Sequence, residues 1–169
     1  MPIALIDVDI RLSGGAGNSN VNASIGGIMS SVLLVNDVLN NLFEDVPGSE
    51  SLPGEEKYRL VYIQNDHGSL TMKNVRVYVQ SDSTAPTEEM DIALAAAGLN
   101  ATETAIADQF TAPAGVSFTH PTTNAGGLAP ANIPSGQRYG VWIRETINPA
   151  STAKDNSTTI IVVDYDTNE

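Results

Sequence analysis

The stretch Tyr58-Arg-Leu-Val-Tyr-Ile-Gln-Asn65 decides the fold class of this chain of 169 residues. Its large side chains alternate, because Tyr58, Leu60 and Tyr62 fall on one side and the residues between them on the other, which is the two-residue period of a β-strand. After a polar turn, residues 70–80 alternate in the same way. The pair predicts an antiparallel hairpin, or two consecutive strands of a β-sandwich.

The same period recurs on both sides of this pair. Residues 35–43 are ambiguous, because their apolar spacing also fits one or two helical turns. Seven to nine short strands, mostly separated by turns at the sandwich spacing of about 8–12 residues, predict an all-β, antiparallel β-sandwich of the immunoglobulin-like or jelly-roll kind. The further strand-like segments are residues 3–12, 30–35, 90–97, 105–119, 136–145 and 158–165. Of these, residues 90–97 are also Ala-rich, which favours a helix, but their two-residue period favours a strand.

The chain divides into two segments of what we expect to be one structural domain. Residues 1–56 hold an N-terminal strand and then an irregular arm rich in Gly, Asn and acidic side chains, whereas residues 57–169 form the sandwich body. A domain of this size buries roughly 69% of its unfolded surface, which supports a core without disulfides. Only 5% of the residues are aromatic, so the core is expected to be aliphatic.

Charge and composition exclude several classes of protein. The chain has 8 Lys and Arg against 20 Asp and Glu, a net charge of −12, and it has no Cys. We therefore expect no nucleic-acid partner, no thiolate metal site and no cysteine nucleophile. We also expect no membrane association, because no stretch approaches about 20 apolar residues and the N-terminus lacks a signal-peptide pattern.

The acidic side chains are concentrated in two places. Residues 44–56 hold five of them and residues 82–91 hold four. We predict that both stretches are loops that face solvent or a basic partner, around a mostly neutral sandwich.

Catalytic signatures are weak in this sequence. The two histidines, His67 and His120, lie in a polar turn and before a proline, where exposed loop positions are the simpler interpretation. Two Asp-x-Asp pairs, Asp7 with Asp9 and Asp164 with Asp166, could place two carboxylates on one side of a strand, as a glycosidase or a Ca²⁺ site requires. We interpret them instead as solvated strand faces, and we predict no enzyme activity and no cofactor.

A carbohydrate site is a second reading of the aromatic residues near the C-terminus. Tyr139 and Trp142 could supply a stacking platform for a sugar ring, although at this spacing core or interface positions are more usual.

Several stretches together resemble the small virion structural proteins encoded in the head and tail gene clusters of tailed bacteriophages. The resemblance spans most of the chain, and it is closest to capsid decoration (cement) proteins in size, acidity and β content. It carries no catalytic residues. The stretches are Arg11-Leu-Ser-Gly-Gly15, residues 18–24 before Gly26-Gly27, Asn41-Leu-Phe-Glu-Asp-Val46, residues 58–67, Ile133-Pro-Ser-Gly-Gln137 and Val141-Trp-Ile-Arg144.

The resemblance implies a non-enzymatic protein of the virion, assembled in the host cytoplasm, that stabilises the phage head by bridging capsid subunits. Its implied partners are the major capsid protein, other virion proteins and further copies of itself. A tail or baseplate component is the alternative within the virion. The irregular segment 13–56 is too long for an ordinary loop, so we expect it to reach across an interface. Candidate interface residues in or beside it are Leu12, Gly14, Gly15, Ile25, Leu42 and Phe43.

Overall fold

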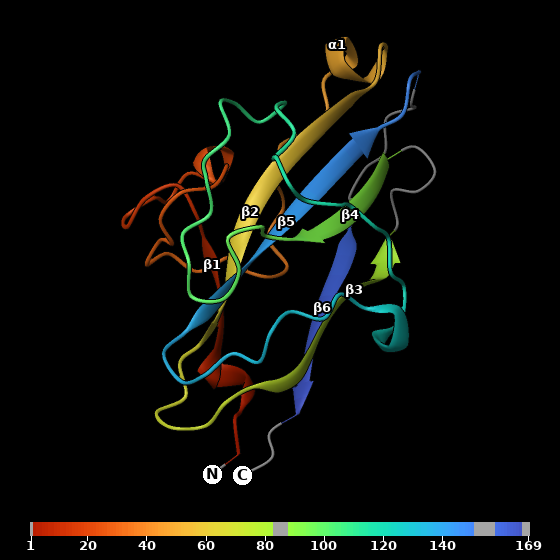
Figure 1. The fold of residues 1–169 in the computed structure, drawn as a ribbon. Coiled ribbons are helices and arrows are strands. Elements are labelled where there is room, and N and C mark those ends of the chain that lie inside the picture. The colour runs from red at the N-terminus through yellow and green to blue at the C-terminus, as the bar shows by residue number, and fades with distance from the viewer. Residues whose placement is uncertain (1, 83–87, 151–157, 167–169) are drawn as a thin grey trace.

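The computed structural model describes residues 2–82, 88–150 and 158–166, which contain six strands and little helix (Figure 1). None of the described helices is long and apolar enough to span a membrane. The strands are β1 (Val8–Leu12), β2 (Glu55–Asn65), β3 (Lys73–Asp82), β4 (Glu88–Leu94), β5 (Arg138–Ile147) and β6 (Thr159–Asp166). The helical turns are η1 (Leu5–Asp7), η2 (Val21–Ala23), α1 (Gly48–Ser51) and η3 (Asn124–Gly126).

The strands form two antiparallel sheets. One has four strands in the order β1-β2-β5-β4, and the other pairs β3 with β6. The prediction of an all-β antiparallel protein is therefore confirmed, with six strands in the described residues where seven to nine were expected. Residues 30–35 and 105–119 are irregular and add only single bridges, Arg11 with Leu33 and Ile92 with Thr119.

The two decisive strands do not form a hairpin. Both edges of β2 are occupied, by β1 and by β5, so β3 belongs to the second sheet, as in the alternative of two consecutive strands. The connection between them is anchored by Asn65, whose side-chain amide donates to the carbonyls of Leu70 and Ile133, each at 2.8 Å.

The main core lies between the two sheets. Its β2 side is formed by Val61 and Ile63, and its β3 side by three alternating valines, with Met90, Ile92, Val141 and Ile143 from β4 and β5. Ile3 and Leu42 are buried in the same core, and β2 begins at Glu55, so the boundary expected between residues 56 and 57 falls inside a strand.

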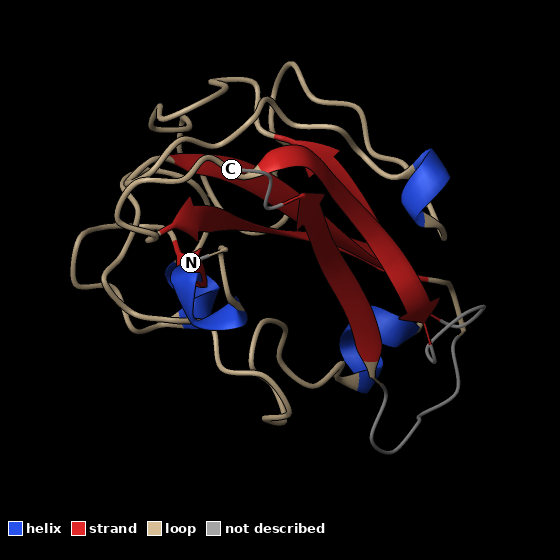
Figure 2. Ribbon diagram, turned by 90° about the horizontal axis from the view of Figure 1, so that it is seen from below, coloured by secondary structure: helices blue, strands red, loops and turns tan. Residues whose placement is uncertain are grey.

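A second core covers the opposite face of the four-stranded sheet. Tyr58, Leu60 and Tyr62 pack there with Trp142, beneath side chains from irregular segments such as Met29 and Phe118. Loops rather than a third sheet thus cover this face, and Figure 2 shows how much of the molecule around the strands is loop. Burial on both faces explains why the central part of β2 is apolar at nearly every position.

The prediction that both acidic stretches are loops is wrong in part. Glu55 and Glu56 begin β2, while Glu88, Glu89 and Asp91 belong to β4. Several acidic residues are therefore part of strands, and two of them, Glu56 and Asp91, pair with Arg144 of β5.

Candidate functional site

The predicted interface residues mostly hold the N-terminal segment onto the sheets. Leu12 and Leu42 are buried in the molecule, and Gly15, Ile25 and Phe43 are half-buried. Gly14 is exposed, but it has φ +93°, and a Cβ there would overlap the carbonyl oxygen of Ala23. These positions are explained by intramolecular packing, and their part in an interface stays a prediction.

Large apolar side chains are exposed at several places in the described chain, including Leu5 and Ile6, and five of them lie in residues 28–39, which we call the apolar segment. Its backbone pairs with the outer edge of β1, because Leu34 N–H donates to the carbonyl of Ile10 at 2.7 Å. The side chains beyond this pairing face solvent: Leu39 is 68% exposed and Val35 is 59% exposed. Ile28, Leu33 and Val38 are also exposed, so five large apolar side chains within twelve residues each leave about half or more of their surface to solvent.

A buried arginine on β2, Arg59, binds the N-terminal segment to the sheet. Its guanidinium is fully buried and donates to the carbonyl of Leu42 at 3.2 Å, to the side chain of Asn22 at 2.7 Å and to that of Gln109 at 2.5 Å. The ring of Phe43 lies 5.3 Å from its carbon centre. Burial lowers the pKa of Arg59 below its ordinary value, and these contacts balance the buried charge.

Lys57, two residues before Arg59 on β2, and Glu145 of β5 are also buried charged residues. Lys57 is opposite Glu145 of β5, and its Nζ is 2.7 Å from the carboxylate of Glu50 in α1. Glu145 is 3% exposed, and one of its carboxylate oxygens has no hydrogen-bond partner. Burial is the largest cause that raises the pKa of Glu145 to about 7, against the opposing attraction of Lys57. Nothing in the alternation of the sequence indicated that these charges would be inside.

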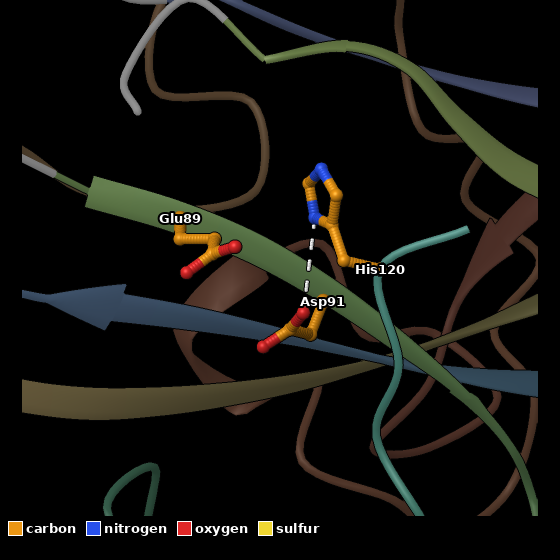
Figure 3. A group of neighbouring side chains, drawn as sticks. All are labelled: Glu89, Asp91 and His120. Carbon is orange, nitrogen blue, oxygen red and sulfur yellow. Dashed lines mark ion pairs between the residues drawn. The ribbon is translucent and has the colours of Figure 1, made fainter. Parts of the chain in front are cut away.

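One group of side chains has the composition of a metal site. Glu89 and Asp91 of β4 and His120 offer ligand atoms within 4.8 Å of one another (Figure 3). However, His120 Nδ1 lies 2.7 Å from the carbonyl oxygen of Met90, so it carries a proton and has no lone pair for a metal. Figure 3 shows the second ring nitrogen directed away from both carboxylates. Asp91 also accepts from Arg144 at 2.5 Å, so the group fastens the residue-120 loop to β4.

The other candidate catalytic residues are also engaged in local structure. His67 Nδ1 accepts the backbone N–H groups of Ser69 and Leu70, and it thereby closes the turn after β2. Asp7 accepts the backbone N–H of Ala4, and Asp9 pairs with Arg11. Asp7 and Asp9 are thus each bound to groups close in the sequence.

Asp164 and Asp166 line a small polar hollow of about 180 Å³ on the outer face of β3 and β6. Their carboxylates accept from the side-chain amides of Asn124 and Asn74, each at 2.6 Å. These carboxylates are therefore bound by neutral donors of the same chain, and the hollow shows no ligand set of its own.

A wider hollow of about 570 Å³ lies beside the second core and is lined mainly by alanines and Pro113 of residues 96–114. Glu103 is its one buried carboxylate, and it accepts the backbone N–H of Ala97 at 2.8 Å. The hollow thus offers methyl groups and backbone rather than a set of polar anchors.

The alternative interpretation of Tyr139 and Trp142 as a sugar platform does not fit the structure. Trp142 is fully buried in the second core, whereas Tyr139 packs against the main core on the opposite face of β5. The two rings cannot stack on one sugar, because neighbouring positions on a strand point to opposite faces. The interpretation of Trp142 as a glycan contact is therefore wrong.

Comparison with known proteins adds no relative: no family model, no curated protein and no solved structure matches this chain.

Proposed function

We propose that this chain is a non-enzymatic structural protein that acts by binding other protein chains, as a capsid decoration protein of a tailed-phage head. In this role it bridges neighbouring capsid subunits, associates with further copies of itself, and is part of the virion after assembly in the host cytoplasm. We also propose that its two packed sheets form a β-sandwich of the immunoglobulin-like or jelly-roll kind, since their facing side chains share the main core.

The observation that carries the proposal is the apolar segment. Large apolar side chains that stay exposed close together on a folded chain are typical of a surface that another protein covers. Here the backbone of residues 30–34 is bonded to β1, and the exposed side chains lie on this stretch or close to it in the sequence. The segment lies within residues 13–56, where the sequence predicted an interface.

The second support is that the candidate catalytic side chains take part in hydrogen bonds and ion pairs within the chain. The two histidines and the paired aspartates make hydrogen bonds and ion pairs that hold turns and loops in place. A protein that works through contact area needs such fasteners and no reacting group.

The test uses phage shells assembled without this protein. The wild-type chain should co-sediment with the shells and raise their melting temperature in calorimetry. Leu39→Asp should weaken co-sedimentation at least tenfold, because it places a charge in the covered surface. Leu52→Asp is the matched control, since Leu52 is 73% exposed and lies outside the apolar segment.

Shells that melt at the same temperature with and without bound protein would contradict the decoration role. Binding that Leu39→Asp leaves unchanged would contradict the assignment of the apolar segment. Labelled antibody seen on the tail rather than the head, in electron micrographs of virions, would favour the tail or baseplate alternative.

A further inference from the structure

The outer edge of β6 differs from the other edges of the two sheets. Irregular segments occupy the outer edges of β1, β4 and β3 with backbone hydrogen bonds, which is a common way to protect a sheet edge. Within the described parts of the chain, no such bond reaches the second edge of β6. The covering bonds include Leu34 N–H to Ile10 O, Thr119 N–H to Ile92 O and Leu128 N–H to Val77 O, at 2.7, 3.0 and 2.8 Å.

The register with β3 shows which groups are open. Val77 exchanges both of its backbone hydrogen bonds with Leu128, so its N–H and C=O point away from β6. Val77 is opposite Val163, and Val79 is opposite Ile161. Because hydrogen-bonded and non-hydrogen-bonded pairs alternate in an antiparallel ladder, Val163 and Ile161 direct their own N–H and C=O groups to the outer edge.

The stretch of β6 whose N–H groups are open toward the outer edge ends before Tyr165. The next outward N–H group is that of Tyr165, which donates to the side chain of Asp164 at 2.9 Å. Within the described residues, the backbone N–H and C=O groups of Ile161 and Val163 therefore remain for a partner strand. The stretch has no Lys, no Pro and no charge between residues 159 and 163, which are the usual devices that prevent strand addition.

We propose that this edge pairs with β6 of a second copy of the chain, antiparallel, about a two-fold axis at Val162. In this register Ile161 lies opposite Val163 of the second copy, and the reverse pair forms by symmetry. The N–H and C=O groups of Ile161 and Val163 from both copies are then joined in four hydrogen bonds. The two β3–β6 pairs join into one four-stranded sheet, and Val162 faces its own copy as a non-hydrogen-bonded pair.

The charges of β6 favour this partner and this direction. Asp164 and Asp166 are at one end of the strand, and the other end is neutral. Antiparallel self-pairing places Asp164 opposite Ile160 of the second copy, whereas parallel pairing would place like charges side by side, which destabilises a sheet. Ile160 is 50% exposed and shares the outer sheet face with Val162, so pairing also covers an apolar patch.

The inference deepens the proposed function, and it rests on that function only for the expectation of self-association. Shell binding depends on the apolar segment, and edge pairing is measured on the chain alone in solution. A failure of one therefore does not imply a failure of the other.

The absence of cysteine makes a direct test possible. In a non-hydrogen-bonded antiparallel pair the Cα atoms are about 4.5 Å apart, within the range of a disulfide. Under mild oxidation Val162→Cys should therefore give a covalent dimer in high yield. Tyr78→Cys is the matched control, because Tyr78 is half-buried and lies opposite Val162 on β3, whose outer edge is covered; it should stay monomeric.

The register of the pairing is tested by cross-linking two different cysteine variants, and the association of the unmodified chain is tested by its mass. A mixture of Ile160→Cys and Asp164→Cys chains should give the mixed disulfide in preference to either self-linked dimer. By light scattering the wild type should have twice the monomer mass of 17.8 kDa, and Val162→Lys should restore the monomer mass. The pairing is overturned if Val162→Cys cross-links no better than Tyr78→Cys, or if folded Val162→Lys keeps the wild-type mass.

Discussion

Glu145→Gln should make this protein more stable at neutral and alkaline pH. Glu145 is buried opposite Lys57, and one of its oxygens has no hydrogen-bond partner. The largest cause that raises its pKa is burial, and the nearby Glu88 carboxylate adds to it, while Lys57 opposes both. Glutamine keeps the shape of the protonated side chain but carries no charge to desolvate.

The magnitude follows from the pKa of Glu145, which is raised from 4.5 to about 7. Each pKa unit corresponds to about 1.4 kcal/mol, so the shift amounts to about 3 kcal/mol. Because the folded state holds this proton more tightly, its contribution to stability is complete below pH 4.5 and is lost as the pH rises through 7. Glu145→Gln should therefore exceed the wild type by about 3 kcal/mol at pH 8, and the excess should shrink toward pH 5.

The assay is urea unfolding of both chains at pH 5, 6, 7 and 8, with the difference in free energy of unfolding plotted against pH. The difference cancels the titration of the other groups. Glu89→Gln is the matched control, because it removes one carboxylate from an exposed position on the neighbouring strand. A difference between Glu145→Gln and the wild type that stays constant within about 0.5 kcal/mol from pH 5 to pH 8 would refute the reasoning.

Two further changes test the packing. Trp142→Ala empties the second core, so it should lower the free energy of unfolding by about 3–5 kcal/mol, measured in urea by circular dichroism; a loss under 1 kcal/mol would show that the loops do not enclose this side chain. Gly14→Ala should cost more than Gly15→Ala, since both have positive φ but only a Cβ at Gly14 overlaps Ala23. Each bears strain of about 1–3 kcal/mol, and equal thermal melting temperatures for the two variants would contradict the close approach at Gly14.

The parts of the fold that local pattern controls were predictable. The alternation around Tyr58 and Val77 placed β2 and β3, and the weaker period at Met90 placed β4, because a strand with buried faces needs its apolar residues two apart. The same period over-predicted strands at residues 30–35 and 105–119. There the chain forms only single bridges and packs its side chains without a ladder.

The candidate site was less predictable. The sequence indicated that the long N-terminal segment would carry an interface, yet the named residues, such as Leu12 and Leu42, are largely internal. The exposed residues, such as Val35 and Leu39, have the same apolar character, and composition cannot tell which of two neighbouring apolar groups lacks a partner. That difference arises from which residues the folded chain places against β1 and the main core.

The sequence by itself determined an acidic, cysteine-free, antiparallel β protein with an aliphatic core, because composition and a two-residue period act locally along the chain. Tertiary structure decided how the strands pair and which charged side chains are buried. Arg59 and Glu145 look like surface residues on their strands, but the partners that bury them come from segments far away in the sequence. The open edge of β6 is likewise a property of the sheets, because an edge exists only relative to the strands and loops that cover the others.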